Sequence, residues 1–165
     1  MSGLSVVADE YDSFDDRRAI ERAANGDRDA LHQVYTATRS FVTRMFRAEL
    51  GGTMGVPAAD AAAEALVPVV VAALLTDRTG APLRVAYTEA VVGIEVARRP
   101  SGVCASDLLG RLPRHERDVL VLRTVVGLTV AQTAEALSCT VQRIMIDQHA
   151  ALGTLRRGAG SSIHS

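Results

Sequence analysis

Apolar residues recur every three or four positions through most of the chain, the spacing that is typical of amphipathic α-helices. The clearest stripe starts after Asp27, a residue type that caps helices, and is expected to end at Gly51-Gly52. Its members, which we expect in the core, are Leu31, Val34, Tyr35, Thr38, Phe41, Val42, Met45 and Phe46. The sequence shows neither the two-residue alternation of strands nor an internal repeat. The pattern therefore predicts an all-α protein.

Three other helices are expected before residue 100, at residues 15–24, 57–75 and 83–99. Pro68 lies inside the second of them and should kink or break it, because proline lacks the backbone N–H and clashes with the preceding turn. Val69–Val71 follow it directly, so this half of the helix is apolar on nearly all sides. Such a helix is either buried within the protein or covered by a partner.

The C-terminal third, residues 112–157, predicts three helices with a tight turn before the last one. Thr129 is expected to cap the second helix, and Gln132 stands three residues later, which is the spacing of a capping box. Ser138-Cys139-Thr140 is expected to form the turn. Two short helices joined in this way make a helix-turn-helix, whose second helix can enter the major groove of DNA. An ordinary small helical bundle is the alternative interpretation.

Several stretches carry a family resemblance. The run LPRHERDVLVLRTVVGLTVAQTAEAL, which starts at Leu112, resembles region 4 of bacterial sigma factors of the extracytoplasmic-function (ECF) group, and the match continues without a gap to Arg156. The runs GDRDALHQVY at 26–35 and ADAAAEAL at 59–66 resemble region 2. The segments VVGLTVAQTAEAL and QHAAL are similar to the mycobacterial sigma D type. The resemblance implies that region 4 docks on RNA polymerase and reads the −35 promoter element, while region 2 binds the polymerase clamp and opens the −10 element.

The helix pattern and the resemblance together predict two small all-α domains, a sigma region 2-like helical bundle and a sigma region 4-like helix-turn-helix, joined by a short linker. The family typically has a much longer linker, so this one could hold the two domains against each other, as in an inhibited sigma factor. The expected segments are a flexible N-terminal tail at 1–14, the region 2-like domain at 15–99, the linker at 100–106, the region 4-like domain at 107–157 and a disordered, Gly/Ser-rich tail at 158–165.

The resemblance assigns polymerase binding to two acidic residues of the helix at 57–75. Asp60 and Glu64 match the second acid and the glutamate of the family's D-D-x-x-Q-E pattern. The first acid and the glutamine are replaced by Ala59 and Ala63. Two polar contacts to the polymerase clamp are therefore expected to be missing.

The helix at 83–99 is, by the same resemblance, the promoter-opening region, and it departs from the family. The basic and aromatic residues that remain for this role are Arg84, Tyr87, Arg98 and Arg99. Ala86, Thr88, Glu89 and Val92 stand where the family has tryptophan, tyrosine and two arginines. An aromatic platform is worth about 1–3 kcal/mol per stacked base, so strand opening by this helix is expected to be weakened.

The last helix is the expected DNA reader. The DNA-binding residues that we predict are Thr129, Gln142, Arg143, Met145 and His149. Arginine can pair with guanine and glutamine with adenine in the major groove, whereas His149 could touch phosphate. Three positions that are basic in the family are Met145, Asp147 and Ala150. We expect Asp147 to face phosphates at a cost unless it accepts from a cytosine, and Met145 with Ile146 to resemble a protein interface.

Composition limits the remaining possibilities. The 165 residues carry a formal net charge of −1, so a basic patch for DNA must be local. The two cysteines form no CxxC motif and have no metal-ligand spacing with histidines, and they are read as reduced thiols. No catalytic residue set, metal site, cofactor motif or signal-peptide core is recognised, and the apolar run Ala65–Leu75 is too short to span a bilayer. These features predict a cytoplasmic protein that is neither an enzyme nor bound to a membrane.

Two functions remain. The first is an ECF-type sigma factor that directs transcription initiation by binding core RNA polymerase and promoter DNA. The alternative is a degenerate sigma-like protein that no longer initiates and acts as a regulatory protein-binding module. Its apolar surfaces, Val69–Val71, Met145 and Ile146, would then bind an anti-sigma factor, polymerase or a second copy of the chain as a homodimer.

Overall fold

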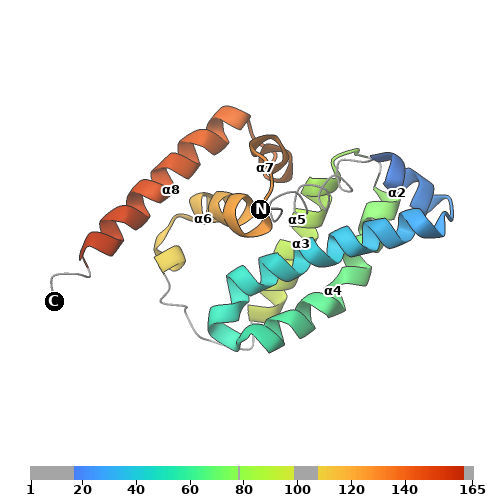
Figure 1. Ribbon diagram of the computed structural model, residues 1–165, viewed down its shortest axis with the longest axis horizontal. Helices are drawn as coiled ribbons and strands as arrows, with labels where there is room; N and C mark the ends of the chain where they lie inside the picture. The colour runs from blue at the N-terminus through green and yellow to red at the C-terminus, as the bar shows by residue number, and fades with distance from the viewer. Residues whose placement is uncertain (1–16, 78, 99–107, 162–165) are drawn as a thin grey trace, which may run out of the picture.

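The computed structural model describes residues 17–77, 79–98 and 108–161, and within these residues it contains helices and no strand. This confirms the predicted all-α class. The elements are α2 (Arg17–Ala24), α3 (Arg28–Met54), α4 (Val56–Thr76), α5 (Pro82–Arg98), a 3-10 helix η1 (Leu108–Arg111), α6 (Arg114–Leu120), a π-helix η2 (Val121–Val126), α7 (Val130–Ala136) and α8 (Val141–Ser161). In Figure 1, α2 to α5 form one body, and η1 to α8 form a second body against it.

Helix α3 is the longest element and the centre of the first body. Asp27 caps it as predicted, because its side-chain oxygen accepts from the backbone N–H groups of Asp29 and Ala30 at 3.0 and 3.1 Å. The predicted end at Gly51-Gly52 is wrong, since the helix continues to Met54 and stops at Gly55, whose φ is 84°. The continuation keeps the fully buried Leu50 and the partly buried Met54 packed in the core. This packing outweighs a helix-propensity cost of about 1 kcal/mol per glycine.

Most of the predicted apolar stripe of α3 is buried. Phe41, Phe46 and their neighbours lie in the core, as expected. Leu31 and Tyr35 are exceptions, with 39% and 37% of their surface exposed. They stand four residues apart at the edge of the stripe, where neither α2 nor α4 covers them. The buried face of α3 is therefore narrower than the apolar stripe in the sequence predicted.

Helix α4 lies beside α3 and is continuous through Pro68, so the expected break is absent. Pro68 is exposed, and water can therefore satisfy the carbonyl that loses its intrahelical donor. The helix is long and apolar enough to cross a membrane, although the run Ala65–Leu75 alone is not. In this structure it packs against α3 and α5, with Val70 and Val71 buried and Val69 exposed.

The second body contains the predicted helix-turn-helix. The capping box of α7 is present: the Thr129 hydroxyl accepts from Gln132 N–H at 3.2 Å, and the Gln132 side chain accepts from Thr129 N–H at 2.8 Å. The turn follows at 138–140, and Ser138 takes a left-handed φ of 53°. Helix α8 then continues to Ser161, so residues 158–161 are helical where a disordered tail was expected.

The two bodies share one hydrophobic core. Val121, Leu122 and Val126 of η2 are buried in the same cluster as the side chains of α3, α4 and α5. Leu128 and Ala136 join this cluster from the start and end of the α7 region. Helix α5 packs on α7, and α3 packs on η2. The two bodies are therefore packed against each other. The expected linker at 100–106 lies outside the described residues.

Candidate DNA and polymerase interfaces

The start of α8 presents the predicted DNA-reading residues to solvent. Gln142, Arg143 and His149 are exposed, and Met145 has 61% of its surface exposed. Thr140 holds the first turn of α8, because its hydroxyl accepts from Arg143 N–H at 3.2 Å. In Figure 1, α8 extends away from α3, α4 and α5, so no part of the first body covers it. The groove-facing position that a helix-turn-helix needs is therefore open.

Thr129 is also exposed, but its side chain is engaged in the capping box of α7. The predicted apolar surface on α8 is present as well, since Ile146 has 57% of its surface exposed beside Met145. The exposed start of α8 thus combines polar readers with an apolar patch.

Asp147 corrects an expectation. We expected its carboxylate to face phosphates, but the residue is only 5% exposed and points into the second body. Its Oδ2 accepts from Arg143 Nε at 2.7 Å and lies 3.0 Å from His115 Nε2 of α6. The carboxylate raises the pKa of Arg143, chiefly by this hydrogen bond. Asp147 therefore does not repel DNA from the surface of α8.

The two predicted polymerase-binding acids face a row of arginines on α3. Asp60 accepts from Arg47 at 2.6 and 2.8 Å, and Glu64 accepts from Arg39 at 2.5 Å. The Arg47 hydrogen bond lowers the pKa of Asp60. The four side chains border a groove of about 490 Å³ between α3 and α4. Exposed ion pairs of this kind contribute about 0–1 kcal/mol, so a charged partner can exchange with them at little cost.

Ala59 and Ala63 lie on another side of α4 from these acids and are fully buried. A polar partner could not reach either position without unpacking α4. The residues that the resemblance marks as missing contacts are here part of the core.

The predicted promoter-opening residues are divided between solvent and the seam between the two bodies. Arg84 is exposed, whereas Tyr87 donates its hydroxyl to Asp118 of α6 at 2.8 Å. Burial raises the pKa of Tyr87, and the Asp118 charge adds to that effect. Arg98 donates to Glu49 of α3 at 2.5 Å. Arg99 lies outside the described residues.

The seam is polar around an apolar centre. Besides Tyr87–Asp118, the backbone N–H of Leu83 donates to Glu135 of α7 at 3.2 Å. Arg44 of α3 donates to the carbonyl of Val126 at 3.0 Å. These two contacts tie α5 and α3 to the helix-turn-helix domain from opposite ends.

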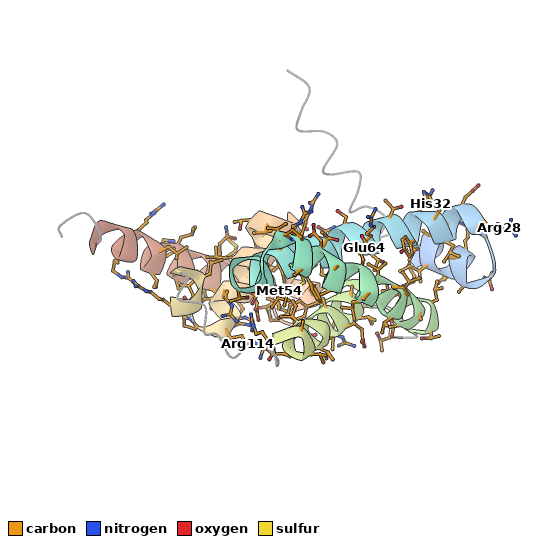
Figure 2. The ribbon with its side chains drawn as sticks, turned by 90° about the horizontal axis from the view of Figure 1, so that it is seen from below. Arg28, His32, Met54, Glu64 and Arg114 are labelled. Carbon is orange, nitrogen blue, oxygen red and sulfur yellow. The ribbon has the colours of Figure 1, made fainter. Side chains whose placement is uncertain are left out.

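A charged cluster closes the far end of the seam. Arg117 of α6 lies 3.4 Å from Glu49, and Arg114 lies 3.9 Å from Glu95 of α5. Figure 2 shows Arg114, at this end of the seam, well apart from Glu64 of the α3–α4 groove. A cavity of about 20 Å³ lies among these side chains, room for about one water. Burial raises the pKa of Asp118, although the Tyr87 hydrogen bond opposes the rise.

Sequence reasoning did not find the seam residues Glu49, Asp118 and Glu135. Tyr87 and Asp118 are separated by 31 positions, and Leu83 and Glu135 by 52. No local spacing connects such pairs, so the short linker was the only available signal. Within the described residues, no group of His, Cys, Asp and Glu is placed to hold a metal ion.

The structure thus combines a helix-turn-helix whose second helix is exposed at its start with a helical bundle that packs against it. Residues 108–157 match the family described as "Sigma-70, region 4". The chain is 28% identical to the "ECF RNA polymerase sigma factor SigD" of Mycobacterium tuberculosis and of Mycobacterium bovis over 170 residues, covering 83% of this chain and 80% of the relative. It is 27% identical to the "ECF RNA polymerase sigma factor ShbA" of Streptomyces griseus, covering 83% of this chain and 91% of that protein.

The fold also has a solved counterpart. The "Structure of CnrH in complex with the cytosolic domain of CnrY" superposes with a TM-score of 0.58 at 22% identity, covering 91% of this chain and 99% of that one. Residues 108–157 therefore belong to the sigma-70 region 4 family, and the chain over 83% of its length is similar to ECF RNA polymerase sigma factors. The resemblance predicted from residues 112–156 and from the region 2-like runs is confirmed.

Proposed function

We propose that this protein is an ECF-type sigma factor that directs transcription initiation by binding core RNA polymerase and promoter DNA. One observation carries the proposal: the segment that matches sigma-70 region 4 folds as a helix-turn-helix whose second helix starts in solvent with Gln142 and Arg143. These are the side-chain types that pair with adenine and guanine in the major groove. The relatives whose alignments cover 83% of this chain are named as ECF RNA polymerase sigma factors. None of these matches supports the degenerate alternative.

On the polymerase side, we assign the contact to Asp60 and Glu64 on α4. Both acids stand at the rim of the α3–α4 groove, and both are held by exposed arginines that a partner's charges can replace. A polymerase surface with basic residues fits the face that carries these two acids.

The packing of the two bodies against each other suggests an order for duplex reading and strand opening at the promoter. Tyr87 is engaged with Asp118, and α5 is packed on α7. Tyr87 of the proposed promoter-opening helix is therefore available to single-stranded DNA only after the two bodies separate, whereas Arg84 is already exposed. We assign that separation to polymerase binding and duplex reading to the already exposed start of α8.

A protein that favours the closed arrangement would keep such a sigma factor inactive. The solved CnrH structure is a complex with the cytosolic domain of CnrY and has a similar fold. We therefore propose an anti-sigma factor as a second partner of this chain. This assignment makes the protein a cytoplasmic, non-enzymatic transcription factor without a cofactor.

The test is reconstitution with core RNA polymerase, followed by transcription from a library of promoters. Co-purification with polymerase and new transcript start sites that require the protein are expected. If it associates with polymerase but produces no start sites, initiation has been lost. If it binds neither polymerase nor promoter DNA, only the fold has been retained, and the search turns to partners of Val69 and of the Met145–Ile146 surface.

A further inference from the structure

One buried carboxylate has a role that neither the fold nor the family match assigns. Asp147 is 5% exposed, yet it stands one helical turn after the exposed Arg143 on α8. Its Oδ2 accepts from Arg143 Nε at 2.7 Å. The same oxygen lies 3.0 Å from His115 Nε2, which fixes it from the side of α6. The carboxylate is therefore held by the protein interior while it holds a surface arginine.

Asp147 accepts from Nε of Arg143, and this determines which donors of the guanidinium remain for another partner. A guanidinium has five N–H donors, of which only one is on Nε. Binding at Nε leaves the terminal Nη1 and Nη2 groups as a parallel pair of donors. Guanine offers O6 and N7 to such a pair in the major groove. The Arg143 side chain has 60% of its surface exposed at the start of α8, although its Nε is bound to the buried Asp147.

Holding the Arg143 guanidinium in place also lowers the entropy that this side chain loses when it binds DNA. A free arginine side chain loses rotamer entropy when it is immobilised. Here the Thr140 hydroxyl holds the backbone of Arg143, and Asp147 holds its side chain. Part of this loss has occurred before DNA arrives.

We propose that Asp147 is a positioning residue that holds Arg143 so that its two terminal nitrogens donate to O6 and N7 of one guanine in the −35 element. This inference rests on the proposed sigma-factor function. A purely structural role is the competing explanation, because Asp147 also joins α8 to His115 of α6. The two explanations differ in what happens to base preference.

The experiment uses holoenzyme formed from core RNA polymerase and each variant of the full chain. Transcripts are counted from a promoter library in which every −35 position is randomised. The wild-type protein is expected to prefer guanine at one position by about 5- to 150-fold, which corresponds to the 1–3 kcal/mol of a bidentate pair. Arg143→Ala should abolish that preference. Asp147→Ala should reduce it at the same position by about fivefold or more, while Asp147→Asn, which keeps an acceptor oxygen, should retain more of it.

The matched control is Val119→Ala, which removes fully buried side-chain volume between α6 and α8 but leaves the Arg143–Asp147 pair and its His115 contact in place. It should lower thermal stability and leave the guanine preference within about twofold of wild type. In the double variant Arg143→Ala/Asp147→Ala, base preference should equal that of Arg143→Ala alone, because Asp147 acts through Arg143.

Three results would overturn the inference. The first is Asp147→Ala losing stability with its guanine preference intact. The second is Arg143→Ala leaving every −35 preference unchanged, which would show that Arg143 does not read a base. Both failures occur with active holoenzyme, so the sigma-factor function would stand. The third is the absence of any protein-dependent transcript from wild-type holoenzyme, which would remove the proposed function and this inference together.

Discussion

The two surfaces assigned to promoter DNA differ in their accessibility. The start of α8 is exposed and lies away from the first body, whereas α5 is packed on α7 with Tyr87 bonded to Asp118. On the proposed assignment, duplex reading and strand opening use surfaces of different accessibility in the free protein. The difference shows that packing of the two bodies covers the Tyr87 side of α5 and leaves the start of α8 exposed.

The shared core is the part of the seam whose loss should have the largest effect. Leu122 is fully buried in the cluster that joins η2 to α3, α4 and α5. We expect Leu122→Ala to lower the free energy of unfolding by about 2–5 kcal/mol, because it removes packed methyl groups and leaves a cavity. Urea denaturation measures this change. Met145→Ala on the exposed α8 surface is the control and should stay within about 0.5 kcal/mol of wild type.

The Tyr87–Asp118 bond should have the next largest effect. Tyr87→Phe keeps the ring but removes the donor of a buried carboxylate, at a cost of about 1–3 kcal/mol. The bond spans the seam, so we also expect a larger radius of gyration by small-angle X-ray scattering. Thr88→Ala changes an exposed neighbour on α5 and should alter neither quantity. An unchanged radius of gyration in Tyr87→Phe would mean that the apolar core alone closes the domains.

The polymerase face should be sensitive to charge but not important for stability. We expect Asp60→Ala/Glu64→Ala to weaken binding to core polymerase by about tenfold, equivalent to about 1.4 kcal/mol. Its effect on unfolding should be small, because both acids are in exposed ion pairs. Surface-immobilised core polymerase gives the affinity, and Glu21→Ala on α2, which removes one exposed acid elsewhere, serves as the control for each single variant, Asp60→Ala and Glu64→Ala. Equal affinities would move the polymerase contact elsewhere on the chain.

The smallest expected effect is the change in the free energy of unfolding with pH that Asp118 causes. Folding raises the pKa of Asp118 by burial, so the folded protein binds more protons than the unfolded chain above the unfolded pKa of about 3.9. The contribution of Asp118 to the free energy of unfolding is therefore most favourable below that pH and is lost as pH rises through the raised value. The hydrogen bond from Tyr87 and the charges of Arg114 and Arg117 limit the rise, which makes the effect smaller than that of Tyr87→Phe.

The measurement is the difference in unfolding free energy between wild type and Asp118→Asn across mildly acidic pH. Asparagine cannot titrate, so this difference should change in favour of wild type as pH falls. Asp60 is the opposite case, since its lowered pKa gives a contribution that is present above the unfolded pKa and lost as pH falls. A difference that is constant with pH would show that Asp118 keeps one protonation state throughout.

Local interactions explain what could be predicted from the sequence. The Asp27 cap and the Thr129–Gln132 capping box join residues two or three positions apart, so the residue types and their spacing are enough to identify them. The all-α class and the region 4-like domain follow from the same short-range patterns and from the family resemblance. The exposed start of α8 was also expected, because Gln142, Arg143 and Met145 lie off its apolar stripe.

Only the tertiary structure decided the rest. Asp147 turns inward because His115 of another helix lies beside it, and Tyr87 faces a carboxylate 31 positions away. Helix α3 passes through Gly51-Gly52 because burial of Leu50 outweighs glycine's low propensity. Each of these outcomes depends on the packing of helices that are distant in sequence, and residue spacing along one helix contains no information about that packing.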